Sequence, residues 1–276
     1  MPTQWSLTPT PPPPPGVSPS HVHALACLLL EDPASEHTAQ VKAFTAALPA
    51  GTARGSVAAS APTLLLSWLD EPTEPDLASR ITGPVRLGSH TAHLSLAARR
   101  TVPYTRLAAT APTPRVRVEF TTPAYVNRGG RQLPLPDPEL LLEGLARRWA
   151  AFSPHPLPCD ATAEALGMVH LARHDTRTVP VGTGRHQRTG FVGHAVFGLP
   201  RASPAARRSF TALWAFAEFA GVGAQTTHGL GHVRVRLRPE TGHPTQRGGT
   251  DRPQRTGRNR PVSTRPTPPR TQNAGT

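Results

Sequence analysis

Two stretches of the sequence alternate strictly between apolar and charged residues, and this pattern limits the fold more than any other feature. They are residues 115–120 (RVRVEF) and residues 233–238 (VRVRLR). Successive side chains of a β-strand point to opposite faces of its sheet, so this alternation predicts strands with one buried and one solvated face. The chain must therefore build a sheet that is apolar on one side and charged on the other.

The residues between these two strands predict a familiar order of elements. Asp137 and Pro138 can begin a helix, because apolar residues then recur at helical spacing up to residue 152. Residues 168–179 and 187–199 are typical of two strands joined by a turn. Ser203 can cap a second helix, which Gly221 would end. The predicted order is β-α-β-β-α-β, the ferredoxin-like unit.

The first part of the chain shows the same order more faintly. We expect a strand over 4–7, a helix from Ser18 that Pro33 ends, strands over 42–48 and 63–69, a short helix over 75–81 and a last strand over 84–96. The predicted fold is therefore α+β, with two tandem ferredoxin-like (βαββαβ) domains. Their predicted bounds are 1–112 and 113–240. Residues 241–276 are rich in Arg and Pro without apolar periodicity, so we expect a disordered basic tail.

The charge balance indicates a polyanionic partner. Lys and Arg number 30 against 17 acidic residues, a formal net charge of +13, of which seven Arg and one Asp in 242–276 supply +6. A body that is basic without its tail can neutralise phosphates, although solubility alone also accounts for an excess of Arg. Lys42 is the only lysine.

Other classes of protein are disfavoured by what the sequence contains. No apolar run approaches the ~18 residues that a membrane span needs, so we expect a cytoplasmic protein with no membrane partner. Two cysteines are too few for a disulfide framework or a four-cysteine zinc site. We expect no metal and no cofactor.

A glycine-rich segment, residues 221–231 (GVGAQTTHGLG), is the sharpest motif. It follows a predicted helix and precedes a strand, which is the reverse of a dinucleotide-binding loop. Two explanations for its glycines remain open. They can provide a tight turn, or they can let the backbone approach a polyanion closely. The second explanation makes this loop a candidate binding site for a polyanion, through the following residues: Gly221, Gly223, Gln225, Thr226, Thr227, His228, Gly229 and Gly231.

Residues 186–235, with "GFVG", an aromatic helix and then "GVGAQTTHGLG", closely resemble the C-terminal region of CRISPR-associated endoribonucleases of the RAMP superfamily. The segments "EFTTPAYV", "PLPDPELLLEGLARRWAAF", "HVHALACLLLED" and "HTAQVKAFTAALP" resemble other parts of that family in the family's order. The resemblance covers about residues 1–238. It implies a RAMP-type fold, CRISPR repeat RNA within precursor CRISPR RNA as the partner, and cleavage within each repeat. It leaves open an association with other CRISPR effector subunits.

The resemblance also implies a chemistry and a set of residues. In this family the ribose 2′-hydroxyl attacks the scissile phosphate without a metal, which gives a 2′,3′-cyclic phosphate and a 5′-hydroxyl. The family's histidine precedes a Lys-x-Phe-Thr segment, which implies that His37 is catalytic here and Lys42 is its cationic partner. Histidine suits proton transfer and lysine suits charge stabilisation. Some members add a tyrosine upstream; here that role is vacant or is taken by His21 or His23.

Two further points stay open at this level. Arg177, Arg185 and Arg188 flank the predicted turn between two strands and either grip an RNA stem or form a solvated charged turn. Because no residue clearly fills the third catalytic role, an alternative function stays open: a non-catalytic RAMP-type scaffold that binds repeat RNA in an effector complex.

Overall fold

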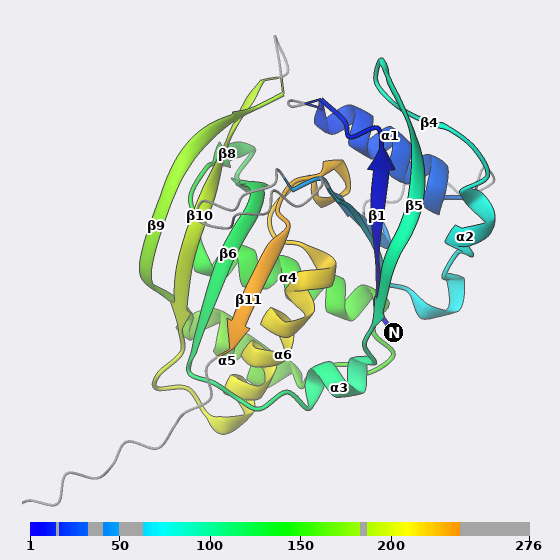
Figure 1. The fold of residues 1–276 in the computed structure, drawn as a ribbon. Coiled ribbons are helices and arrows are strands. Elements are labelled where there is room, and N and C mark those ends of the chain that lie inside the picture. Colours follow the sequence, from blue (N-terminus) through cyan, green and yellow to red (C-terminus); the bar gives the residue numbers. More distant parts are fainter. Residues whose placement is uncertain (15–16, 33–40, 50–62, 183–186, 238–276) are drawn as a thin grey trace, which may run out of the picture. The chain divides into compact units, whose positions relative to one another are not determined.

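The computed structural model describes residues 1–14, 17–32, 41–49, 63–182 and 187–237, and its longer strands form two antiparallel sheets (Figure 1). The first sheet has the order β2-β3-β1-β5-β4, with β1 (Thr3–Thr10), β2 (Phe44–Ala47), β3 (Leu64–Trp68), β4 (Val85–Leu87) and β5 (His90–Thr101). The second has the order β11-β6-β10-β9, with β6 (Arg115–Ala124), β9 (His170–Val181), β10 (Arg188–Gly198) and β11 (Val233–Leu237). Apart from β4, both orders are those of the ferredoxin-like unit, so the predicted α+β class is confirmed.

The described helices are α1 (Pro19–Leu30), α2 (Leu77–Arg80), α3 (Tyr104–Ala108), α4 (Pro138–Phe152), α5 (Cys159–Met168) and α6 (Pro204–Ala220), with 3₁₀ turns η1 (Glu71–Thr73) and η3 (Thr226–His228). Of these, α1, α4 and α6 begin directly after the predicted N-cap residues Ser18, Asp137 and Ser203. The Asp137 carboxylate accepts a hydrogen bond from the backbone N–H of Leu140, and the Ser203 hydroxyl accepts one from that of Ala206. The caps predicted at Asp137 and Ser203 are therefore confirmed, whereas Ser18 occupies the N-cap position of α1 but makes no capping hydrogen bond with its side chain.

The sequence pattern misjudged one strand and missed four elements. Residues 84–96 are not one strand: the chain reverses at Gly88, where φ is +69°, so that Leu87 of β4 pairs with His90 of β5. The helices α3 and α5 and the small hairpin of β7 (Val126–Arg128) and β8 (Arg131–Leu133) were not predicted. In α5 only Ala161 and Ala165 are buried, which leaves little apolar periodicity to detect.

Each sheet covers its own core. In the second, the buried side chains of β6 pack with α4 and α6, and Tyr104 contacts Trp149 edge-to-face at 5.0 Å between ring centroids. In the first, α1 packs Leu25 and Leu29 against Trp5 and its neighbours. Residues 1–241 belong to a single compact unit that includes both sheets. The predicted boundary at 112/113 falls between α3 and β6 and stays a prediction.

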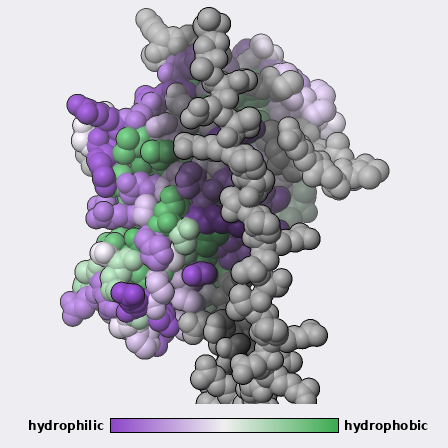
Figure 2. Space-filling model, turned by 90° about the vertical axis from the view of Figure 1, so that its left-hand side faces the viewer, coloured by the Kyte–Doolittle hydropathy of each residue, from purple (hydrophilic) through white to green (hydrophobic). Residues whose placement is uncertain are grey.

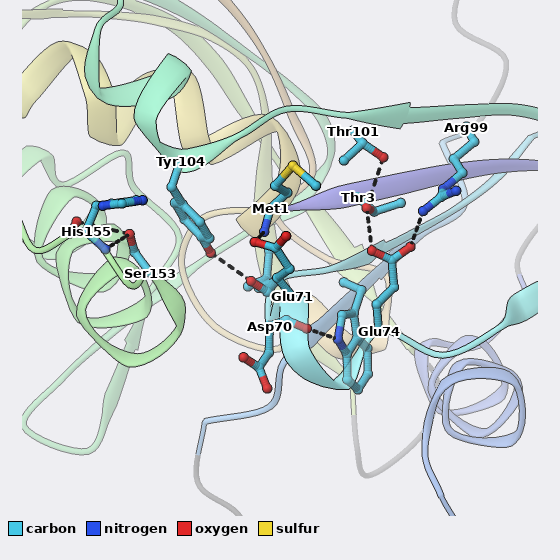
Figure 3. A network of polar contacts seen from close by, with 12 residues as sticks. Met1, Thr3, Asp70, Glu71, Glu74, Arg99, Thr101, Tyr104, Ser153 and His155 are labelled. Carbon is cyan, nitrogen blue, oxygen red and sulfur yellow. Dashed lines mark hydrogen bonds and ion pairs between the residues drawn. The ribbon is translucent and has the colours of Figure 1, made fainter.

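A polar network ties the segment after β3 to the edge of the first sheet (Figure 3). The Thr3 hydroxyl donates to the Glu74 carboxylate at 2.9 Å, and Arg99 forms an ion pair with the same carboxylate at 2.6 Å. The Tyr104 hydroxyl donates to the carbonyl of Leu69 at 2.9 Å. The end of β3 is thereby fixed to β1, β5 and α3.

Within the described ranges, no helix is both long enough and apolar enough to span a membrane. The predicted tail, residues 241–276, lies outside the described residues.

Candidate active site and basic cleft

The C-terminal end of α6 meets the first sheet, and side chains from three other elements satisfy its last carbonyl groups. Gln4 Nε2 donates a hydrogen bond to the carbonyl of Glu218 at 3.0 Å, and Thr45 Oγ1 donates one to the carbonyl of Phe219 at 2.8 Å. The Arg148 guanidinium donates to the carbonyl of Ala220. The final carbonyls of a helix have no partner within the helix, so such side chains remove a desolvation cost. The start of the glycine-rich loop is therefore held by β1, β2 and α4.

Two glycines of the loop are required by contacts within the protein. A Cβ atom at Gly223 would overlap the carbonyl oxygen of Tyr125, and one at Gly231 would overlap that of Val222. Their φ angles are +74° and +68°, which L residues rarely adopt. The Ala224 N–H donates to the same Tyr125 carbonyl at 2.9 Å. Packing of backbone on backbone therefore explains these two positions.

The loop also joins the two halves of the protein. Gly229 forms a parallel bridge with Ala47, the last residue of β2. Thr226 is buried, and its hydroxyl accepts a hydrogen bond from Arg148 of α4. Gln225 takes a left-handed conformation at the start of η3. Of the predicted RNA contacts, Thr226 is thus engaged inside the protein.

His228 of the loop stacks on His23 of α1. The ring centroids are 3.8 Å apart and the rings are within 5° of parallel. His23 Nδ1 lies 3.2 Å from the carbonyl oxygen of Thr227 and must donate, because a carbonyl only accepts. Its Nε2 lies 3.5 Å from Cys27 Sγ, and His228 Nδ1 lies 3.0 Å from Thr227 Oγ1.

The electrostatic surroundings keep the His228 ring uncharged. Burial lowers the pKa of His228 to about 4, and the nearby charges of His23 and Arg188 act in the same direction. A neutral imidazole at pH 7 is compatible with the close stacking on His23. His228 is thus poised as a hydrogen-bonding group rather than a cation.

A row of polar side chains continues along α1 from His23. Cys27 and Glu31 follow at intervals of four residues, which places all three on one side of the helix. The Glu31 carboxylate forms an ion pair with Lys42 Nζ at 2.7 Å, and their side chains are only 8% and 18% exposed. Burial and, after it, Glu31 raise the pKa of Cys27 to about 11, so the thiol stays protonated. The partner of Lys42, Glu31, was not identified from the sequence.

The structure separates the histidine candidates. His37 lies outside the described residues. His21 is exposed and its ring lies against Gly88, whereas His23 faces the glycine-rich loop. Positions two apart on a helix point in different directions, so only one of the two can reach the loop. His23 is that one.

The arginine candidates also divide. Arg185 lies outside the described residues. Arg188 sits over the ring of Tyr125, 5.9 Å from its centroid, and lies near enough to His228 to lower its pKa. Arg177 lines a cleft on the second sheet.

That cleft has a volume of about 690 Å³ and lies on the sheet face opposite the buried residues of β6. Its charged lining comes from β6, β9 and β11: Arg117, Glu119, Arg177, Arg234 and Arg236. His194 of β10 and Leu48, which follows Ala47 of β2, also line the cleft. Figure 2 shows the side of the molecule nearest β9, where hydrophilic residues are interspersed with smaller hydrophobic groups. Four arginines against one carboxylate make the lining strongly basic.

The pairing of strands places like charges together in this cleft. Arg117 of β6 lies directly opposite Arg236 of β11. Within the part of the chain that the structure describes, none of the four cleft arginines forms an ion pair. Like charges directly opposite each other destabilise a sheet. Such an arrangement suits a surface that receives a polyanion. The sequence pattern predicted only that the arginines of each strand lie on a solvated face. Which arginines of different strands lie opposite each other depends on the register of the strands, which the pattern does not contain.

A metal site requires several ligating side chains close together. Over the described ranges, no group of three or more His, Cys, Asp or Glu side chains is placed to hold a metal ion.

Comparison with known proteins gives consistent matches. Residues 118–233 match the family model described as CRISPR-associated endoribonuclease Cas6. The CRISPR-associated endoribonuclease Cas6 of Mycobacterium tuberculosis, in two strains, is 31% identical over 124 residues, 45% of this chain. The chain covers 39% of the length of these curated relatives.

Solved structures match over a longer range. A Cas6 product complex is 26% identical with a TM-score of 0.69, and a Cas6 substrate mimic complex is 27% identical with a TM-score of 0.68. Each match covers 86% of this chain and 100% of the other. Thermus thermophilus Cas6, 23% identical over 85% of this chain and 97% of its own, shares the fold with a TM-score of 0.61. The second half of the chain is thus similar in sequence to CRISPR-associated endoribonuclease Cas6, and the fold is that of solved Cas6 structures.

Proposed function

We propose that this protein is an endoribonuclease that binds CRISPR repeat RNA and cleaves precursor CRISPR RNA within each repeat. The observation that carries the proposal is the cleft whose four arginines have no carboxylate partner among the described residues. It adjoins the glycine-rich loop, because Gly231 donates to the carbonyl of Pro123 in the cleft wall at 2.9 Å. An RNA backbone in the cleft would therefore pass close to the loop. The description of the matching family and of the curated relatives as CRISPR-associated endoribonucleases supports RNA as the substrate class, and two similar solved structures are described as product and substrate mimic complexes of Cas6.

The proposed reaction is attack of a ribose 2′-hydroxyl on the adjacent phosphate. The new bond joins the 2′-oxygen to phosphorus, the bond to the 5′-oxygen breaks, and the products are a 2′,3′-cyclic phosphate and a 5′-hydroxyl. A base takes the 2′-proton, an acid supplies one to the 5′-oxygen, and a cation stabilises the charged phosphorane. No step in this scheme needs a metal.

We assign proton transfer to His37 and charge stabilisation to Lys42. Lys42 is held by Glu31 at the end of α1, so its ammonium is positioned before RNA arrives. A phosphate that reaches this ammonium competes with the carboxylate for it. One similar solved structure is a histidine-to-alanine mutant of a Cas6 protein, which supports the assignment of a functional role to a histidine.

The test is single-turnover cleavage of a CRISPR repeat RNA by the purified protein. His37→Ala should slow cleavage by ~10²–10⁴-fold, the usual contribution of general acid–base catalysis, with little change in affinity. A 2′-deoxy nucleotide before the cut should abolish cleavage by the wild type without weakening binding, and EDTA should have no effect. Full activity of the His37 variant would refute the assignment, and cleavage of the deoxy substrate would refute the mechanism.

Lys42 needs a control for its ion pair. Lys42→Gln alone removes a cation that is paired with the buried Glu31 carboxylate, so a loss of activity could reflect a loss of stability. The double variant Lys42→Gln, Glu31→Gln replaces the pair by neutral groups. We expect it to melt close to the wild type and still to cleave at least ~10²-fold more slowly. Wild-type cleavage by a folded double variant would remove Lys42 from the mechanism.

A scaffold function is the second candidate, because Lys42 is already engaged by Glu31. Tight binding of repeat RNA by the wild type with no cleavage over hours would favour the scaffold over the enzyme.

A further inference from the structure

One acidic residue lies among the arginines of the basic cleft. Glu119 is the only carboxylate among the described residues that line it. Its side chain is exposed on β6, and strand pairing places it directly opposite Arg234 of β11 and His194 of β10. Asp175 of β9 lies opposite His194 on the far side but does not line the cleft.

No close ion pair holds the Glu119 carboxylate among the described residues. No carboxylate–arginine distance within 4.0 Å involves it in the described part of the protein, although Arg117 and Arg234 are its neighbours. In a cleft that receives phosphates, an unpaired carboxylate repels the ligand and lowers affinity. Because the Glu119 carboxylate repels the phosphate backbone of RNA, any favourable contact that it makes must be with another part of the RNA.

The chemistry of a carboxylate defines that part. An ionised carboxylate only accepts hydrogen bonds, so it cannot bind phosphate oxygens. The donors on RNA are the 2′-hydroxyl and the N–H groups of the bases. Guanine presents two adjacent donors, N1–H and N2–H, on its Watson–Crick edge, and these match the two oxygens of one carboxylate. Bases that are not paired expose this edge, and proteins read RNA sequence mainly at such bases.

We propose that Glu119 is a specificity-determining residue that reads the Watson–Crick edge of one unpaired guanine while the surrounding arginines hold the backbone. This inference rests on the proposed function, since it requires RNA in the cleft. It predicts that Glu119 lowers general affinity for RNA and raises selectivity.

The test begins with a pool of single-stranded RNA 20-mers randomised at every position. Wild type, Glu119→Gln and, as a matched control, Glu143→Gln are used to select bound RNA; Glu143 is exposed on α4, outside the cleft. We expect RNA bound by wild type and the control to be enriched in guanine at one position by roughly 5- to 150-fold, the range of a good bidentate contact. Glu119→Gln should bind the pool at least as tightly and lose that enrichment.

Base analogues then test the contact itself. In the selected RNA, inosine at that position removes the N2 amino group and should weaken wild-type binding several-fold, whereas 7-deazaguanine keeps the Watson–Crick edge and should not. Neither analogue should change binding by Glu119→Gln.

The outcomes separate the two proposals. Equal guanine enrichment in wild type and Glu119→Gln, or enrichment of cytosine or adenine that depends on Glu119, would overturn the reading of guanine while RNA binding stands. Failure of the wild type to bind the pool in a salt-dependent way would overturn the proposed function and the inference with it.

Discussion

Replacing Arg236 by Gln should stabilise the protein without RNA and weaken its binding to RNA. Arg236 lies directly opposite Arg117, and neither has an ion-pair partner among the described residues. A like-charge cross-strand pair costs ~0.2–1 kcal/mol, so its removal should return about that amount. For a domain of 150–250 residues, 1 kcal/mol corresponds to ~2–4 °C in melting temperature. We therefore expect a rise of about 0.5–4 °C for Arg236→Gln at low salt.

The RNA side of the same prediction concerns the salt dependence of binding. If Arg236 contacts one phosphate, its removal should reduce the slope of log affinity against log salt by ~0.7 for single-stranded RNA. The gain in melting temperature should shrink in 1 M salt, where the screening length is ~3 Å. Thermal melting at 20 mM and 1 M salt, with fluorescence anisotropy of labelled RNA between 50 and 200 mM salt, measures both.

Arg115 provides the matched control. It is exposed on the same strand and face as Arg117, lies opposite Gly198 on β10, and does not line the cleft. Arg115→Gln should change neither the melting temperature nor the salt slope measurably. A lower melting temperature for Arg236→Gln than for wild type at low salt would refute the reasoning, as would equal effects of the two variants.

Three further predictions concern the loop and the ends of its neighbours. Gly223→Ala should destabilise the protein by ~1–3 kcal/mol or more, because its Cβ would overlap a backbone carbonyl and φ is +74°. Gly167→Ala, in a helix with open space around the new Cβ, should stabilise the protein by ~0.5–1 kcal/mol. Denaturant unfolding measures both changes in the free energy of unfolding. Folded-state burial lowers the pKa of His228 and of His232 to about 4, below the ordinary 6.5, so stability should be complete above pH 6.5 and decline as pH falls toward 4; the melting temperature of His228→Gln should decline less steeply over pH 6.5–5. Thr45→Val should cost ~1–3 kcal/mol by leaving a carbonyl at the end of α6 unpaired, and Thr45→Ser should restore most of it.

Local signals predicted most of the fold. The alternation in residues 115–120 and the caps at Asp137 and Ser203 depend only on neighbours in sequence, and they indicated the right elements in the right order. The β4–β5 hairpin was missed because its turn at Gly88 sits inside an otherwise uniform run of residues typical of a strand. Helix α5 buries only two alanines and carries almost no periodic signal.

The candidate site was predicted less completely because its geometry depends on contacts between distant segments. That Arg117 meets Arg236 follows from strand register, which no local pattern contains. That Lys42 pairs with Glu31 depends on where β2 begins relative to the end of α1. The choice of His23 over His21 depends on which flank of the helix the glycine-rich loop contacts. His37 stays a prediction.

The capped end of α6 has a consequence for how this protein can vary among its relatives. Gln4, Thr45 and Arg148 donate to main-chain carbonyls of residues 218–220, and a carbonyl is the same whatever side chain its residue carries. Positions 4, 45 and 148 should therefore keep hydrogen-bond donors across an alignment, while the side chains at 218–220 drift under other constraints. Pairwise covariation, which detects contacts through linked changes of two side chains, should be nearly blind to this junction. These hydrogen bonds would then be detected as conserved donors in the single alignment columns 4, 45 and 148, and not as pairs of columns that change together.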